Sequence, residues 1–219
     1  LMTLHVKKGT DWNSVYAQAR SIAPEAFEAD RINNLVMGEW ASVGTPSAHV
    51  NPVDQMPIQG PPKVDHQTAI DAVAAAARQH KAWGQVALDE RKVRVSAALV
   101  GLREARDTIA LFLSWEIGKP WKLACADVDR CIDGVEWYLT QIDRQMEGRS
   151  PLSGPVSNIA SWNYPLSVLV HAELVQMLAG NAAIAKTPSQ GGFHSLTLAH
   201  AVMAKAGLPV TLLSGVGAT

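Results

Sequence analysis

The sequence predicts an α/β fold in which an amino-terminal helical and hairpin segment leads into a parallel βαβαβ sheet. Three short apolar runs, VSNIA, AAIAK and VTLLSG, follow one another after Pro155, and helical segments of ordinary length separate them. This order of strand, helix, strand, helix and strand is typical of parallel βαβ units with right-handed crossovers. The 219 residues, 47% of them hydrophobic and 18% charged, suffice for one large domain or two small ones.

Residues 1–63 are predicted to form an irregular segment that contains a hairpin. The stretch GTPSAHVNPVDQMPIQGPPK carries several of the twelve prolines, and proline interrupts regular structure because it lacks a backbone N–H. Upstream of it, NNLVMGEWASV has the pattern of a turn in an edge hairpin.

Residues 64–148 are predicted to be helical. The Ala-rich stretch DHQTAIDAVAAAARQHKAW predicts a helix that Asp65 caps. Its apolar spacing places four residues on the buried face: Ile70, Val73, Ala74 and Ala77. A second helical stretch runs from about Asp89 to Ile117, with a break near REARD, and GKP ends it.

The third helix of this region carries the two cysteines. An apolar stripe at spacings of three and four consists of Val128, Cys131, Ile132, Val135, Leu139, Ile142 and Met146. Cys131 belongs to that stripe, so we expect a buried and unreactive thiol, whereas the context of Cys125 leaves its role open. Neither cysteine has the spacing of a zinc or redox site, and we expect no metal centre.

The segment SWNYPL lies between a predicted strand and a predicted helix. Pro165 suits the first turn of a helix, and Gly180 ends the apolar stretch that follows it. Asn163 therefore falls in a strand-to-helix turn near the positive end of the helix dipole. Two roles are open for it: an ordinary helix cap, or a donor that faces negative charge.

Three polar or glycine-bearing segments follow the three predicted strands. Asn163 follows the first strand, Lys186 and TPSQGG follow the second, and GVGAT follows the third. Because ligands bind beyond the carboxyl ends of parallel strands, these segments are expected to converge on one binding edge. Lys186 is either a solvated strand end or a donor to sugar hydroxyls or phosphate. The two glycines of GVGAT are equally compatible with a simple turn.

Composition excludes several classes of function. The net charge of −1 gives no electrostatic footprint for nucleic acid, and the longest apolar run is too short to span a membrane. The first thirty residues contain no apolar stretch of signal-peptide length. We therefore expect a cytoplasmic protein with neither a nucleic-acid nor a membrane partner.

The motifs SWNYPL, LAGNAAIAKTPSQ, AGLPVTLLSG and WEIGKP occur in the order expected of the aldehyde dehydrogenase superfamily, and NLVMGEW and NPVDQMPI also resemble segments of that family. The resemblance covers most of the chain beyond about Asn34. It implies that residues 64–148 are the helical part of a cofactor domain and that residues 149–219 begin a Rossmann-like NAD(P)-binding sheet. It also implies that the catalytic domain is absent from this chain.

The resemblance implies a role for each residue that matches a family motif. Asn163 matches the donor to the oxyanion formed when a thiolate attacks an aldehyde, and Tyr164 matches a residue that lines the aldehyde tunnel, although an aromatic there is equally compatible with core packing. Lys186 matches a residue that binds the adenosine ribose. The implied cofactor site consists of Ile159, Ala160, Ser161, Trp162, Lys186, Ser189 and Gly215.

Two residues depart from the family pattern. Ser161 stands where the family usually has Pro, so we expect a less constrained backbone and a less rigidly held Asn163. Ser189 stands where many NAD-preferring members have Glu. A carboxylate there would repel a 2′-phosphate, so the sequence predicts that the intact protein accepts NADP at least as well as NAD.

The implied activity is NAD(P)-dependent oxidation of an aldehyde to a carboxylic acid through a Cys thioester. The family's nucleophilic Cys and general-base Glu lie downstream of the matched motifs, so the isolated chain is expected to be inactive. The intact protein is expected to be a homo-oligomer with an uncharged small-molecule aldehyde as substrate. Two alternatives are a CoA-acylating aldehyde dehydrogenase and a truncated, non-catalytic subunit that binds nucleotide or assists assembly.

Overall fold

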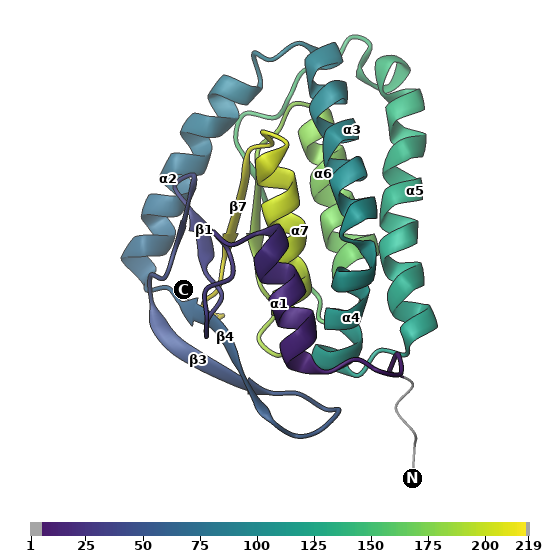
Figure 1. Cartoon of the computed structure of the whole chain (residues 1–219). Helices are drawn as coiled ribbons and strands as arrows, with labels where there is room; N and C mark the ends of the chain where they lie inside the picture. Colours follow the sequence, from purple (N-terminus) through teal and green to yellow (C-terminus); the bar gives the residue numbers. More distant parts are fainter. Residues whose placement is uncertain (1–5, 218–219) are drawn as a thin grey trace.

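The computed structural model describes residues 6–217, and it confirms the predicted α/β class (Figure 1). Ala218 and Thr219 of the GVGAT run lie outside the described residues. The helices are α1 (Trp12–Ile22), α2 (His66–Trp83), α3 (Leu88–Glu104), α4 (Arg106–Ile117), α5 (Trp121–Met146), the π-helix η1 (Pro165–Val170), α6 (His171–Leu178) and α7 (Phe193–Lys205). The strands are β1 (Asn34–Val36), β2 (Glu39–Ala41), β3 (Thr45–Val50), β4 (Pro57–Lys63), β5 (Val156–Ile159), β6 (Ala183–Lys186) and β7 (Val210–Leu213).

The main sheet has five strands in the order β2-β1-β7-β6-β5. Strands β5, β6 and β7 are parallel, as the three apolar runs predict, and α6 and α7 provide the crossovers between them. The predicted edge hairpin is also present: β2 pairs with β1, and β1 adds antiparallel to β7. Met37 and Gly38 both have positive φ, 55° and 81°, which suits the tight turn of a two-residue hairpin.

Residues 1–63 contain more regular structure than the irregular segment with a hairpin that the sequence predicts. Helix α1 begins at a capping box formed by Asp11 and Ser14. The proline-rich stretch forms a second hairpin, β3–β4, which is a separate two-stranded sheet. Proline is tolerated in β4 because this two-stranded sheet leaves an edge on which no ladder hydrogen bond is required.

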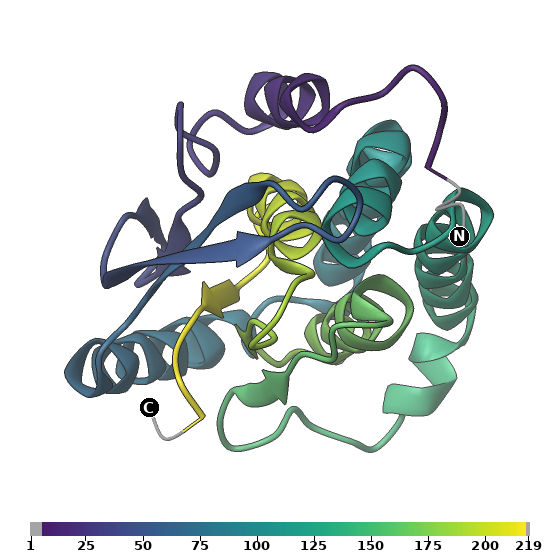
Figure 2. The ribbon, with the colours of Figure 1, turned by 90° about the horizontal axis from the view of Figure 1, so that it is seen from below.

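The two faces of the main sheet are covered unequally (Figures 1 and 2). Helix α2 lies on one face, where a small cluster consists of Val36, Val64, Ala72, Ala76, Ile184 and Leu213. The other helices pack on the opposite face and hold the main core, which includes Leu174, Met177 and Leu196. Alternation along β6 accounts for this division: Ile184 belongs to the small cluster, whereas Ala183 and Ala185 belong to the main core.

The buried face predicted for α2 is wrong. Asp65 caps the helix as predicted, since its side chain accepts from the Thr68 amide at 2.7 Å. However, the four residues assigned to the core are exposed: Ile70, Val73, Ala74 and Ala77. Ala72 and Ala76 face the sheet instead. An alanine run fits several helical registers, so its spacing does not select the side that packs.

The remaining helices agree with their predictions. The second helical stretch is broken at Ala105, between α3 and α4, and Gly118 ends α4 in the left-handed region with φ 71°. Cys131 on α5 is fully buried within its apolar stripe. The helix predicted after Pro165 forms, but its first six residues are wound as the π-helix η1.

Candidate functional site at the carboxyl edge of the sheet

Three of the segments singled out from the sequence meet at one edge of the parallel sheet. Ile159, Lys186 and Leu213 occupy adjacent register positions at the carboxyl ends of β5, β6 and β7. The Ala160 amide donates to the Lys186 carbonyl at 2.9 Å, so the pairing continues into the turn that carries Asn163. The predicted convergence of these loops is therefore confirmed.

Asn163 does not cap the helix that follows it. The residue before η1 is Tyr164, and no side chain caps the first turn. The Asn163 side chain is exposed, and its Oδ1 atom accepts a short hydrogen bond from the Ser161 hydroxyl. The capping alternative is therefore wrong for this structure, and the Nδ2 amino group is the half of the amide that Ser161 does not engage.

The contact with Ser161 bears on the expectation that serine leaves Asn163 less rigidly held, which stays a prediction. A proline at position 161 would restrict φ but would offer no donor. The hydroxyl of Ser161 instead donates to the Oδ1 end of the Asn163 amide. Serine therefore gives the Asn163 side chain a hydrogen-bond partner that proline would lack.

A buried ion pair contacts the backbone of this turn. Lys119 Nζ donates to the Asn163 carbonyl at 2.7 Å and to Asp127 Oδ2 at 3.1 Å. The same Nζ lies 3.9 Å from the centroid of the Tyr164 ring, within cation–π distance. Burial lowers the pKa of Lys119, and the Asp127 carboxylate opposes that shift.

Apolar side chains stand exposed around the Asn163 turn. Ile159 is 79% exposed, Trp162 57% and Tyr164 37%. Large apolar side chains at this exposure are unusual for a position that only packs, and they suit contact with a planar or apolar ligand group. Tyr164 is partly exposed in the described residues, and both of its alternatives, tunnel lining and packing, stay open.

Ser189 and Gly215 line one cavity of about 260 Å³ beside the ends of β6 and β7. Lys63, Ser47 and Ser214 also line it, and none of its described lining residues carries a carboxylate. Hydroxyl groups and one cation form a donor set that matches a ribose or a phosphate. The residues of this cavity thus fit the adenosine end of a nicotinamide cofactor.

Lys186 lies near this cavity in a half-buried position. Its Nζ atom donates to the carbonyl of Thr187 at 3.0 Å. Burial, together with the nearby charge of Lys63, lowers the pKa of Lys186. An anion bound between the two lysines would relieve their mutual repulsion.

Sequence reasoning missed the contribution of the β3–β4 hairpin to this edge. Figure 2 looks from the end at which the chain leaves β7, and the hairpin crosses that end beside α7. Lys63 forms an isolated parallel bridge with Ser214, and the Val64 amide donates to the Ser214 carbonyl at 2.8 Å. The buried Asn34 joins this corner because its Oδ1 accepts from the Ser214 amide at 2.9 Å. No local pattern in GPPK signals that partnership.

The cysteines do not contribute to the edge. Both Cys125 and Cys131 are buried free thiols on α5, and burial raises the pKa of each. In residues 6–217 no group of three or more His, Cys, Asp or Glu side chains is arranged to hold a metal ion. No helix in that range combines the length and hydropathy needed to span a bilayer.

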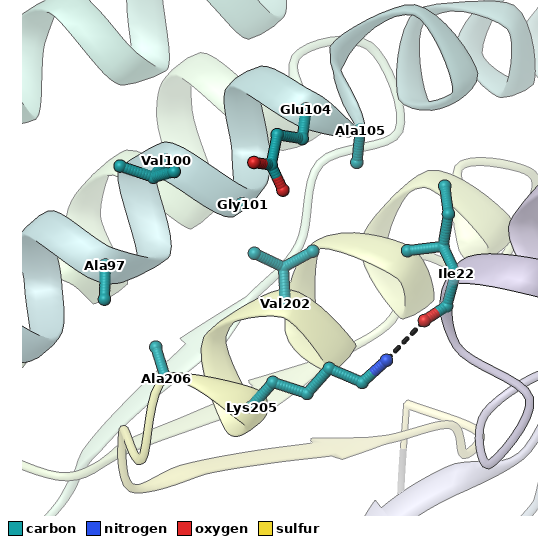
Figure 3. A pocket seen from close by; sticks show the side chains of 9 residues that line it. All are labelled: Ile22, Ala97, Val100, Gly101, Glu104, Ala105, Val202, Lys205 and Ala206. Carbon is teal, nitrogen blue, oxygen red and sulfur yellow. Dashed lines mark hydrogen bonds between the residues drawn. The ribbon is translucent and has the colours of Figure 1, made fainter.

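A separate hollow of about 420 Å³ lies between α3 and α7 (Figure 3). Ala97, Val100 and Val202 give it an apolar lining, and Lys205 donates across it to the Ile22 carbonyl. None of the site residues predicted from the sequence lines this hollow. It is therefore distinct from the carboxyl edge.

A family model described as "Aldehyde dehydrogenase family" matches residues 40–219. This match covers the Asn163 turn, β6 and β7, and it spans well over half of the chain. The chain belongs to the aldehyde dehydrogenase family. This membership confirms the resemblance that the sequence motifs carry.

Individual relatives agree with that membership. The chain is 27% identical over 177 residues to the 1-pyrroline-5-carboxylate dehydrogenase of Staphylococcus aureus, covering 73% of this chain and 34% of the relative. The Thermus 1-pyrroline-5-carboxylate dehydrogenase with bound NAD superposes with a TM-score of 0.75 at 21% identity, covering 97% of this chain and 45% of that structure. The NADP-dependent glyceraldehyde-3-phosphate dehydrogenase of Bacillus halodurans, complexed with NADP, superposes with a TM-score of 0.73 at 24% identity. The superposition covers 85% of this chain and 44% of that structure.

These comparisons establish the fold and the family. At these identities the superpositions show a shared fold alone. The chain spans about a third of the length of the curated relative and less than half of each solved structure.

Proposed function

We propose that this chain is the amino-terminal part of an NAD(P)-dependent aldehyde dehydrogenase and that it supplies the cofactor-binding edge and one oxyanion donor. The observation that carries the proposal is the state of Asn163. Its side chain is exposed at the carboxyl edge, and Ser161 holds its carbonyl oxygen so that the amino group remains to donate. A neutral, oriented donor stabilises negative charge that develops in the transition state.

The cofactor-binding residues of the proposal divide into two groups. Ile159, Ala160, Ser161 and Trp162 form the turn beside β5, near the proposed site of chemistry. Lys186, Ser189 and Gly215 lie at the ends of β6 and β7, where Lys63 completes a set of donors without a carboxylate. When bound, a nicotinamide cofactor would accept the hydride that leaves the aldehyde carbon.

The proposed reaction oxidises an aldehyde to a carboxylic acid through a thioester on a Cys outside this chain. Both cysteines of the chain are buried and remain as thiols, so they do not fit the role of nucleophile. The residues of this chain would orient the aldehyde oxygen and exclude water around Trp162 and Tyr164. Two alternatives remain: transfer of the acyl group to CoA, and a non-catalytic subunit.

The intact protein, produced from its complete reading frame, tests the proposal. It is mixed with NAD or NADP and an aldehyde, with and without CoA, and both cofactor reduction and the acyl product are measured. We expect cofactor reduction without CoA and a carboxylic acid as product. Formation of a thioester only when CoA is present would support the acylating alternative, and a folded intact protein without any cofactor reduction would support the non-catalytic one.

Two substrates separate the proposals about the aldehyde. 1-Pyrroline-5-carboxylate, named in the matched relatives, carries a carboxylate, whereas benzaldehyde is uncharged. The described residues at the Asn163 turn are neutral and aromatic at the surface, and they favour the uncharged substrate. A preference for 1-pyrroline-5-carboxylate would show that residues beyond this chain bind a charged group and set the specificity.

A further inference from the structure

Lys119 is buried to a degree that is unusual for a lysine. Only 9% of the residue is exposed, although it lies in the short connection between α4 and α5. Lysine is rarely buried unless its charge is paired, and removing an ammonium group from water carries a large cost. The contacts of its Nζ atom therefore define what the burial achieves.

The Nζ atom is directed at the Asn163 turn. It donates to the Asn163 carbonyl at 2.7 Å and lies 3.9 Å from the Tyr164 ring centroid. Its counter-charge is Asp127 on α5, a fully buried residue whose Oδ2 lies 3.1 Å away. One lysine thus contacts both residues that precede the π-helix.

Asp127 holds the other side of the same turn. Its Oδ1 accepts from the Ser167 amide at 2.9 Å. Ser167 is in the first turn of η1, where backbone N–H groups have no partner within the helix, and Pro165 has no N–H to offer. The Lys119–Asp127 pair therefore fixes the chain before and after Pro165, and the start of η1 cannot shift without breaking one of these hydrogen bonds.

Stability alone does not explain why Lys119 and Asp127 are buried as an ion pair at this turn. Well-packed apolar side chains often stabilise a fold as well as a buried ion pair does, so the pair itself is poor evidence for stability. What the ions add is a defined position for the main chain of Asn163. Displacement of a catalytic group by about 1 Å can cost roughly a hundredfold in rate.

We infer that Lys119, oriented by Asp127, is a positioning residue that fixes the main chain of Asn163 so that its side-chain amide meets the reacting oxygen. This inference rests on the proposed oxyanion role of Asn163. Lys119 acts on the backbone, and Ser161 acts on the side chain of the same residue. Both the main chain and the side chain of Asn163 therefore have a hydrogen-bond partner.

The test uses the intact protein with the variant Lys119→Met/Asp127→Asn. This double substitution removes both charges together, so no unpaired ion is left buried. We expect kcat to fall about tenfold to a hundredfold while the KM for the cofactor stays within about twofold, because neither Lys119 nor Asp127 hydrogen-bonds to a residue of the proposed cofactor site. Lys122 is exposed near the start of α5, the helix that carries Asp127. Lys122→Met is therefore the matched control and should leave kcat unchanged.

The same double substitution is then introduced into an Asn163→Ala background. If the pair acts through Asn163, kcat should fall little further once the amide is gone. An equal fall in both backgrounds would show a merely structural role and would overturn the inference, as would an unchanged kcat in the first background. If the double variant does not fold, Lys119→Arg keeps the charge beside Asp127 but replaces the single Nζ donor by a planar group, and an unchanged kcat there would also overturn the inference.

The outcomes separate this inference from the proposed function. Absence of turnover in the wild type, or normal turnover in Asn163→Ala alone, would refute the role of Asn163 itself. Turnover that depends on Asn163 but not on Lys119 would refute only the positioning role.

Discussion

Replacing Ser189 by Glu is expected to shift cofactor preference in the intact protein from NADP toward NAD. Ser189 is exposed at the rim of the cavity that Lys63 and Gly215 also line. A 2′-phosphate brings nearly two negative charges, and a neighbouring lysine and hydroxyl groups can accommodate it. A glutamate at the same place would repel that phosphate, whereas its carboxylate could accept hydrogen bonds from the ribose hydroxyls of NAD.

The distance between the two charges sets the magnitude of this effect, and the width of the cavity gives its scale. A sphere of about 260 Å³ is roughly 8 Å across, and unit charges at that separation repel by about 2 kcal/mol at an effective dielectric constant of about 20. The second phosphate charge nearly doubles this value, and solvent and salt then reduce it several-fold because the position is exposed. A remaining difference of about 1.4 kcal/mol corresponds to a tenfold change in relative affinity.

Binding titrations of NAD and NADP to wild type and to Ser189→Glu measure this change. We expect the wild type to bind NADP at least as well as NAD, and the variant to favour NAD by a further tenfold or more. Ser153→Glu adds the same charge before β5, at the opposite end of the sheet, and should leave the ratio of affinities unchanged. A wild type that strongly prefers NAD, with a ratio that Ser189→Glu does not alter, would show that Ser189 does not face the ribose.

Two further predictions concern buried titratable groups. The isolated chain is expected to show no aldehyde oxidation, because Cys125 and Cys131 are buried thiols of raised pKa; oxidation that disappears on replacing either by Ser would refute this. Burial alone would lower the pKa of His200, but the Glu173 carboxylate 3.0 Å from its Nε2 raises it above 6.5 overall. The pair therefore stabilises the fold fully below pH 6.5 and loses this contribution as pH rises through the raised pKa, so urea unfolding of His200→Gln should lack that pH-dependent loss. An identical decline of unfolding free energy in both proteins would show that His200 is not its source.

The parallel sheet was predictable from local sequence because its signals are local. Strands β6 and β7 are short, mostly apolar runs, β5 begins and ends with the β-branched residues Val156 and Ile159, and Gly180 and Gly118 mark the ends of neighbouring helical segments. The exposed face of α2 was not predictable, since an alanine run has no single apolar stripe. Which side of α2 is buried depends on its contacts with the sheet, and these involve residues such as Ile184 that are distant in sequence.

The site was predictable only in its sequence-local part. The βαβ order predicts that Asn163, Lys186 and Ser189, which lie at or after the ends of parallel strands, share one edge of the sheet. Lys63 reaches the same edge through a bridge to Ser214, which is some 150 residues away in the sequence. The hydrogen bond between Ser161 and Asn163 was not predictable either, because residue spacing does not show whether a serine hydroxyl reaches a side chain two positions away. Side-chain partners of this kind depend on geometry that spacing does not encode.

The kinetics of Asn163→Ala in the intact protein test the central claim most directly. Asn163→Ala removes the proposed oxyanion donor without touching β6 or β7, and Asn13→Ala, on the exposed face of α1, is its matched control. We predict that kcat falls about a hundredfold or more while the affinity for the cofactor changes little, because one such donor contributes roughly 3 kcal/mol to the transition state. A correctly folded variant with a normal turnover number would contradict the claim.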